Sequence, residues 1–385
     1  MKLWQSNRSI LAVCAILVAG VFSGAWPITA DGADETRLGE SVSLQGYMGI
    51  YGNQMHQATV LAVEEVNQQG GINGRKIKLF SYDEASSREQ VLSVMERLIQ
   101  SDQVLAIHGP SGTAMAKVGW PYSVRFGVPV ITSTTAPGMT DIGPCTFRYS
   151  LPESELYPIA VKLVAAKLHP KTAVLVYAKD EAYSATNAPF MKRALEANGI
   201  TILAETAHTM QDVNYSALVT RIKGLKPDLI AITTLPEPGI NLIREARRMG
   251  LTQTFVGGNA FNTPKIIELG ASAAEGLIVG TPWFIGNAAK GNKSFVEAYG
   301  KRWNQAPDQF AAQGYQGMQV IFTALRNTQL TGDTAKDRAA LCRAMTEIKD
   351  VPGPLEPFNF DATRSPKPTG ISVIQVKRGT FALFE

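Results

Sequence analysis

The sequence predicts an α/β protein with two lobes, each built around a parallel β-sheet. Short apolar runs recur along the chain with helical segments between them, which is the pattern of successive βαβ units. The alternation of strands and helices is interrupted around Cys145 to Pro152, and a second set of βαβ units begins after it. Two such lobes joined by several passes of the chain form a hinged clamp. The strands are expected at residues 37–43, 76–82, 104–108, 128–132, 172–177, 201–205, 229–233, 254–257, 277–281, 371–377 and 380–384.

Helices are predicted from apolar spacing and from capping residues. The first carries one apolar stripe, and Gly70-Gly71 ends it. The second begins with Ser87 and Gln90 in capping-box register. The stripe of the first helix consists of Met55, Ala58, Ala62 and Val66. Further helices are expected at residues 238–248, 292–303, 308–327 and 335–347.

The passes between the lobes divide the chain into discontinuous parts. We expect the chain to cross between the lobes first near Cys145, again near Pro282-Trp283, and a third time at Val351–Pro354. Phe261, Trp283 and Phe284 lie where the lobes face each other, either lining an apolar pocket or packing at the crossing. We expect a first lobe from residues 31–148 and 284–352, and a second from 149–283 and 353–385.

Residues 1–30 have the pattern of an export signal. Lys2 and Arg8 precede an apolar run from Ile10 to Phe22, and Pro27-Ile28-Thr29-Ala30 then stands before an acidic segment. The apolar run is shorter than the roughly 18–20 residues that span a bilayer. The sequence therefore predicts cleavage near Ala30 and a periplasmic location.

Composition argues for a globular protein and against several other classes. The chain has 385 residues, of which 45% are hydrophobic and 18% charged, enough for two cores. Its net charge is +4 without clustered Lys and Arg, so no nucleic-acid partner is expected. The four histidines lack motif spacing, so we expect no enzyme, no metal site and no cofactor. Cys145 and Cys342 lack zinc-ligand spacing and are either a disulfide or two separate buried thiols.

Two strand ends carry the residues that point to a ligand. The strands at 104–108 and 128–132 each open into a loop of hydroxyl and glycine residues. In parallel sheets, ligands bind outside the carboxyl ends of the strands, where hydroxyls and backbone amides meet an anionic group. Ordinary turn chemistry is the alternative. The two loops consist of Ser111, Gly112 and Thr113, and of Ser133, Thr134 and Thr135.

These features together resemble the periplasmic solute-binding proteins of ABC importers, specifically the branched-chain amino acid (Leu/Ile/Val) type. The resemblance implies the type I periplasmic-binding fold: two Rossmann-like lobes joined by a three-stranded hinge. It further implies capture of a small carboxylate-bearing ligand by lobe closure, delivery to a membrane permease, and a monomer. The matching segments are Tyr51-Gly52, Asn67–Arg75, Tyr82-Asp83, Gly109-Pro110-Ser111, Gly127–Ile131, Phe255–Gly258, Ala274-Glu275-Gly276, Gly353-Pro354-Leu355 and Phe360-Asp361.

The resemblance also implies roles for single residues. The two hydroxyl loops match the loops that grip a ligand carboxylate in this family. Tyr51 resembles an aromatic wall of the first lobe and Tyr183 the corresponding wall of the second. The alternative for either tyrosine is a half-buried packing residue with its hydroxyl in water.

Two positions depart from the family pattern. Asn259 stands where amino acid binders carry an acid for the ligand ammonium, and Leu235 replaces an aromatic residue. An amide cannot neutralise a desolvated ammonium. Glu237 either supplies the missing charge or caps the helix that follows. A carboxylic acid without an ammonium, aromatic or aliphatic, is therefore an alternative ligand, and a periplasmic sensor subunit is an alternative role.

Overall fold

The computed structural model describes residues 35–368 and 370–385, so the predicted signal segment lies outside the described residues. Twelve strands in this part of the chain form two sheets. The first sheet has the order β2-β1-β3-β4-β5, and all its strands are parallel. Its strands are β1 (Glu35–Val42), β2 (Lys76–Asp83), β3 (Ala106–His108), β4 (Val130–Thr132) and β5 (Thr146–Arg148).

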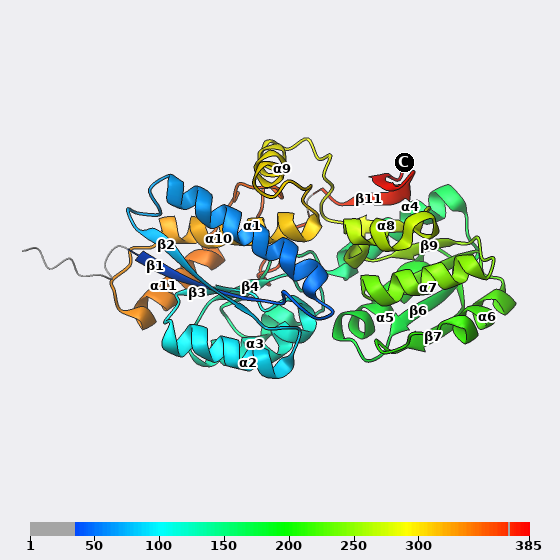
Figure 1. Cartoon of the computed structure of the whole chain (residues 1–385), viewed down its shortest axis with the longest axis horizontal. Helices are drawn as coiled ribbons and strands as arrows, with labels where there is room; N and C mark the ends of the chain where they lie inside the picture. Colours follow the sequence, from blue (N-terminus) through cyan, green and yellow to red (C-terminus); the bar gives the residue numbers. More distant parts are fainter. Residues whose placement is uncertain (1–34, 369) are drawn as a thin grey trace, which may run out of the picture. The chain divides into compact units, whose positions relative to one another are not determined.

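Helices cover both faces of the first sheet, α1 and α10 on one face and α2 and α3 on the other (Figure 1). The predicted stripe of α1 is confirmed, because its four apolar residues are all buried. Ser87 is the N-cap of α2, as expected, and its hydroxyl accepts from the Gln90 N–H. These helices are α1 (Gly49–Gln68), α2 (Arg88–Glu96), α3 (Gly112–Arg125), α10 (Gln309–Arg326) and, packed on α10, α11 (Thr334–Glu347).

The second sheet has the order β12-β11-β10-β9-β8-β6-β7, and only β11 and β12 run antiparallel to their neighbours. Helices α4 and α5 pack in one apolar cluster with it, and α6, α7 and α8 in another. The strands are β6 (Thr172–Ala178), β7 (Thr201–His208), β8 (Leu229–Thr233), β9 (Thr254–Gly257), β10 (Ile278–Thr281), β11 (Ser372–Lys377) and β12 (Thr380–Leu383). The helices are α4 (Glu153–Leu168), α5 (Ala182–Ala197), α6 (Ser216–Leu225), α7 (Pro236–Arg248) and α8 (Pro264–Gly270).

Three passes of the chain join the two sheets. The first follows β5, the second runs from β10 to α9 (Lys290–Trp303), and the third precedes β11. In the third pass, Val351 pairs with Phe358 and Phe360 with Pro366 in isolated bridges. The predicted fold of two α/β lobes connected three times is confirmed.

One strand and several strand boundaries differ from the sequence-based expectation, and β7 ends three residues later than predicted. β5 lies in the segment that the sequence assigns to the first crossing between the lobes. It has only three residues and contains Arg148. The Arg148 side chain is buried and donates to the Ala136 carbonyl at 2.8 Å. β3 and β4 begin two residues later than predicted, since the N–H groups of the buried residues Val104 and Val128 donate to Leu98 and Ser123 and not to a neighbouring strand. Burial and strand pairing produce the same apolar pattern, so sequence alone did not separate them.

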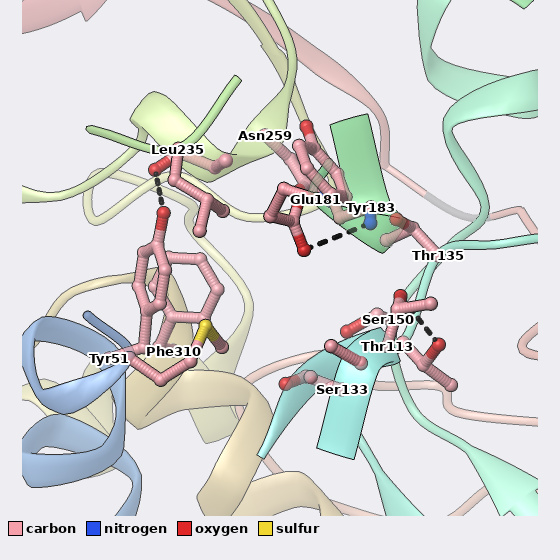
Figure 2. A pocket seen from close by; sticks show the side chains of 15 residues that line it. Tyr51, Thr113, Ser133, Thr135, Ser150, Glu181, Tyr183, Leu235, Asn259 and Phe310 are labelled. Carbon is pink, nitrogen blue, oxygen red and sulfur yellow. Dashed lines mark hydrogen bonds between the residues drawn. The ribbon is translucent and has the colours of Figure 1, made fainter. Parts of the chain in front are cut away.

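The carboxyl ends of both sheets lead into the loops and helix starts drawn in Figure 2. From the first sheet these are the segments after β1, β3, β4 and β5, and from the second those after β6, β8 and β9. Because all these strands are parallel to their neighbours, their ends converge.

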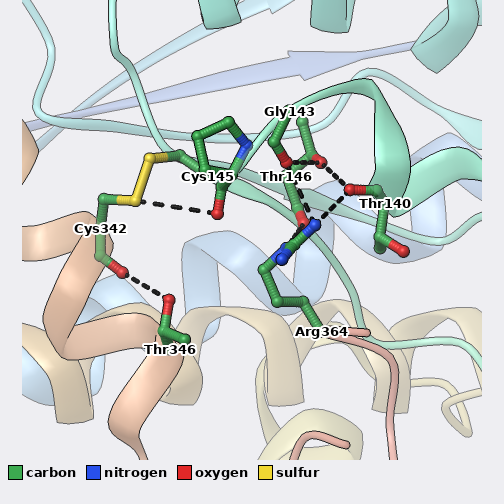
Figure 3. Close-up of a disulfide and its surroundings, with 8 residues drawn as sticks. Thr140, Gly143, Cys145, Thr146, Cys342, Thr346 and Arg364 are labelled. Carbon is green, nitrogen blue, oxygen red and sulfur yellow. Dashed lines mark hydrogen bonds between the residues drawn. A yellow bond between two sulfur atoms is a disulfide. The ribbon is translucent and has the colours of Figure 1, made fainter. Parts of the chain in front are cut away.

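Cys145 and Cys342 form a disulfide, which decides between the two alternatives left open by the sequence. The bond joins the residue before β5 to α11, with Cα atoms 5.5 Å apart (Figure 3). Arg364, from the third pass, donates to the carbonyls of Thr140, Gly143 and Thr146 beside it. The disulfide therefore ties the edge strand of the first sheet to a helix 197 residues away.

We expect reduction of this disulfide to lower the free energy of unfolding. A cross-link over so long a loop restricts the unfolded chain and is worth about 5 kcal/mol in the chain-entropy treatment. Chemical denaturation with and without reductant measures the difference. A variant with both cysteines changed to serine should be less stable and insensitive to reductant. Equal stability of the oxidised and reduced protein would contradict the prediction.

Candidate functional site

A cavity that opens to solvent lies between the carboxyl ends of the two sheets, and we call it the inner cavity. It has a volume of about 450 Å³ including its opening to solvent. All its lining residues are buried except Ala114, which is partly buried. The lining residues are Met48, Tyr51, Gly112, Thr113, Ala114, Ser133, Thr134, Thr135, Ser150, Glu181, Tyr183, Leu235, Asn259, Ala260 and Phe310.

Hydroxyl groups of the first lobe form one side of the inner cavity (Figure 2). The hydroxyls of Thr113 and Thr134 are 2.9 Å apart and hydrogen-bonded to each other. Ser150 donates to Gln313 Oε1 at 3.1 Å. Ser133 donates to the Met55 sulfur at 3.7 Å, a weak acceptor that a ligand oxygen can replace. This side of the cavity offers neutral donors to an anionic group.

An apolar wall stands opposite these hydroxyls. The rings of Tyr51 and Phe310 pack with centroids 4.1 Å apart, and Met48 and Leu235 extend the wall. The Tyr51 hydroxyl donates to the Ala260 carbonyl at 3.1 Å, so this residue joins the two lobes. Burial raises the pKa of Tyr51 well above its usual value, which keeps this donor protonated.

Two further hydrogen bonds join the lobes around the cavity. The Asn187 amide, on α5, donates to Thr135 Oγ1 at 3.1 Å. Gln309, at the start of α10, donates to the Asn259 carbonyl at 3.3 Å. With the Tyr51 contact, these bonds connect residues from both sides of the predicted clamp.

A buried carboxyl group positions the second-lobe side of the cavity. Glu153, the first residue of α4, is fully buried. Its Oε1 accepts from the Tyr183 hydroxyl at 2.5 Å and from the Asn259 backbone N–H at 2.9 Å. Burial raises the pKa of Glu153 to about 8, although these two donors lower it. Glu153 is therefore protonated at neutral pH and holds two lining residues in place.

Glu181 is the acid that lines the inner cavity. It is the N-cap of α5, where its two oxygens accept from the Tyr183 and Ser184 N–H groups at 3.0 and 2.8 Å. Its side chain is 6% exposed, and burial raises its pKa. In the described residues it forms no ion pair.

The structure brings most of the predicted site residues together. Tyr51, Tyr183, Leu235 and Asn259 line the inner cavity, as do the hydroxyl loops apart from Ser111. The Ser111 hydroxyl instead accepts from the Ser43 N–H, while its backbone N–H donates to Glu84.

Glu237 does not line the inner cavity. It lies in the first turn of α7, where a negative charge interacts favourably with the helix dipole, and faces an adjoining outer cavity. The outer cavity shares Ala114, Glu181 and Leu235 with the inner one.

Sequence reasoning missed six lining residues. Ser150 follows a strand that was not predicted, and Phe310 comes from a helix that carried no ligand signal. Glu181 follows β6, so the strand-end rule applied to the first lobe would have found it. The other missed residues are Met48, Ala114 and Ala260.

The second-lobe aromatic candidates pack elsewhere. Trp283 is 2% exposed and donates to Asn292 Oδ1 at 2.6 Å, which favours packing at the crossing. Phe261 packs in the apolar cluster of α7 and α8, and Phe284 at its edge. None of the three lines the inner cavity.

Residues 35–368 and 370–385 contain neither a membrane-spanning helix nor a cluster of metal-ligating side chains. No helix there is long and apolar enough to cross a membrane. The same residues contain no group of His, Cys, Asp and Glu side chains placed to hold a metal ion.

The chain is similar to known binding proteins over most of its length. The family described as "Periplasmic binding protein" matches residues 35–380. The Leu/Ile/Val-binding protein BraC3 of Rhizobium johnstonii is 26% identical over 328 residues, which is 85% of this chain and 87% of that protein.

Two solved structures show the same fold. The branched-chain amino acid binding protein LivJ of Streptococcus pneumoniae, in complex with isoleucine, superposes with a TM-score of 0.83 at 23% identity, covering 90% of this chain and 97% of that one. A solute-binding protein of an ABC transporter from R. palustris, in complex with benzoate, superposes with a TM-score of 0.79 at 22% identity, covering 91% and 95%.

Two α/β lobes around a cavity lined by buried side chains define a two-lobed small-molecule-binding protein. The chain belongs to the periplasmic binding protein family. Of the two structures with the same fold, the R. palustris protein is a solute-binding protein of an ABC transporter.

We expect Glu153→Gln to flatten the pH dependence of stability. Between pH 4.5 and 8 the carboxyl is protonated in the folded protein and ionised in the unfolded chain, so the free energy of unfolding falls as pH rises. The slope from this one group is about 1.4 kcal/mol per pH unit, and the amide removes it. Denaturation at pH 5, 6.5 and 8 measures the slope.

Glu155→Gln is the matched control for this slope, because Glu155 lies in the same helical turn but is exposed. It should leave the slope unchanged. An unaltered slope in Glu153→Gln would show that this carboxyl ionises normally.

Proposed function

We propose that this protein is the solute-binding subunit of an ABC importer and captures a small amino acid with an aliphatic or aromatic side chain. The observation that carries the proposal is the inner cavity, with hydroxyl donors on one side and an apolar wall on the other. A ligand with a carboxylate at one end and an apolar body fits this division. The names of the relatives support the same ligand class.

Neutral donors are suited to reversible capture of the carboxylate. No Lys, Arg or His is among the residues that line the inner cavity. The carboxylate would be held by hydroxyls and by backbone N–H groups at the start of α3, where the helix dipole favours negative charge. Such bonds to a charged group are worth about 1–3 kcal/mol each, enough for selectivity while allowing release.

Closure of the lobes supplies the signal for delivery. Tyr51, Asn187 and Gln309 each form a hydrogen bond across the cavity, and these bonds favour the closed state. A membrane permease that recognises this state would receive the ligand. The predicted export signal supports action in the periplasm, after cleavage near Ala30.

A second candidate ligand is a carboxylic acid without an ammonium group. Asn259 favours it, because this lining residue presents a neutral amide whose buried Nδ2 has no hydrogen-bond partner in the described residues. The structurally similar protein that binds benzoate supports this candidate as well. A sensor subunit would use the same closed state with a different partner.

We expect Ser133→Ala and Thr135→Val to weaken binding by about 1–3 kcal/mol each, since each change removes one donor to the ligand carboxylate. Isothermal titration of the ligand-stripped protein measures the loss. Ser93→Ala, at an exposed position of α2, is the control and should bind normally. Unchanged affinity in both cavity variants would exclude these hydroxyls from the site.

Thermal melting with matched ligand pairs separates the two candidates. The pairs are L-leucine with 4-methylpentanoate and L-phenylalanine with 3-phenylpropanoate. A ligand at about 100 times its Kd adds about 2.7 kcal/mol to the folded state, which raises Tm by several degrees. We expect the amino acids to raise Tm more. A shift with the desamino acids alone would establish the second candidate.

A further inference from the structure

Glu181 is a buried acid without an ion-pair partner among the described residues, and only two backbone N–H groups and the more distant charge of Lys117 favour its ionised form. Its side chain is 6% exposed, and no cation lies within ion-pair distance of it in the part of the chain that the structure describes. An isolated buried carboxylate is costly unless a positive partner is supplied. The partner is therefore to be sought in the cavity that Glu181 lines.

Glu181 lies between the hydroxyl side and the apolar wall of the inner cavity. Figure 2 shows its carboxyl group between the hydroxyls of the first lobe and the wall formed by Tyr51, Phe310 and Leu235. In an α-amino acid, the ammonium group lies next to the carboxylate and at the base of the side chain. A ligand with its carboxylate on the hydroxyls and its side chain on the wall brings its ammonium toward Glu181.

Hydrogen-bonding capacity remains on this carboxyl group. Each oxygen accepts one backbone N–H, from Tyr183 or from Ser184, which uses two of about four lone-pair sites. An ammonium group offers three donors and no acceptor. The two N–H bonds fix the orientation of the carboxylate and leave acceptor sites for the ligand.

Capping alone does not account for a glutamate at this position. Asn, Asp and Ser are the preferred N-cap residues, and elsewhere in this protein Ser87 caps α2 and Asp333 caps α11. Those two caps are at exposed helix starts, whereas Glu181 extends into a cavity.

The other acids near the site are less suited to this task. Glu237 faces the outer cavity only, and Asn259 is uncharged. Glu153 lies behind Tyr183 and Asn259, where its Oε1 is already bound by both. Among the lining residues of the inner cavity, Glu181 is the one carboxylate.

We infer that Glu181 recognises the ligand ammonium and thereby makes the protein selective for α-amino acids over the corresponding desamino acids. The inference rests on the proposed function, because it takes the hydroxyls as the carboxylate site. Glu181, at the start of α5, then supplies the negative charge that the neutral amide of Asn259 does not.

Isothermal titration of Glu181→Gln with both matched pairs tests the assignment. The unaltered protein should bind L-leucine or L-phenylalanine at least tenfold more tightly than its desamino partner. Glu181→Gln should reduce that ratio at least tenfold, mainly through weaker amino acid binding. Glutamine keeps a carbonyl acceptor for the helix cap, and Glu181→Ser keeps a preferred N-cap residue if the first variant folds poorly.

Two controls separate charge recognition from other effects. Asp333→Asn changes a capping carboxylate on α11, away from both cavities, and should leave the ratio unchanged. Glu237→Gln should also leave the ratio unchanged, because this acid faces the outer cavity.

Four outcomes would overturn the inference. If the ratio survives in both Glu181 variants, or is lost in Glu237→Gln instead, another group recognises the ammonium while the proposed function stands. Equal or tighter binding of the desamino acids by the unaltered protein overturns the inference and selects the second candidate ligand. Failure of all four compounds to bind overturns both the inference and the proposed ligand class.

Discussion

Parallel strand pairing is the constraint on which the binding site depends. In a parallel sheet every strand delivers its carboxyl end to the same edge, so loops far apart in sequence converge there. The first lobe brings Thr113, Ser133 and Ser150 together in this way, and the second brings Glu181, Leu235 and Asn259. Three passes of the chain place the two edges opposite each other, and Tyr51 and Asn187 bond across the gap.

Each lobe supports its half of the cavity with a buried carboxyl group that touches no ligand position. In the first lobe, Glu84 accepts from the hydroxyls of Ser41 and Ser43 and from the Ser111 N–H, which holds the loops after β1 and β3 together. In the second lobe, Glu153 does the same for Tyr183 and Asn259. Burial raises the pKa of both groups. The cavity walls are thus fixed by polar contacts within each lobe, and lobe movement need not rearrange them.

The inner cavity has its one carboxylate at the start of α5 and a neutral amide after β9. Asn259, two residues after β9, carries an amide, and the acid of the cavity is Glu181 at the start of α5. Both positions lie at the same edge of the second sheet, so a negative charge can be moved between strand ends without changing the fold. Electrostatic complementarity to a zwitterion requires an acid near the ammonium and does not require it on one particular loop.

The sequence by itself determined the class of this protein, because the period of its apolar runs specifies βαβ units and the residues at strand ends indicate where a ligand binds. The sequence was sufficient to predict the two sheets, the apolar stripe of α1 and the hydroxyl loops, since each of these shows as a local pattern. Only the tertiary structure decided that Cys145 pairs with Cys342, that Ser111 supports the cavity from behind, and that Phe310 completes its wall. These contacts join segments up to 259 residues apart, as between Tyr51 and Phe310, and local sequence carries no signal of such pairings. Glu181, the charged residue of the cavity, is a further case in which local sequence is not sufficient. It has the local sequence of a helix cap, and only the packing of the two lobes places it in the cavity.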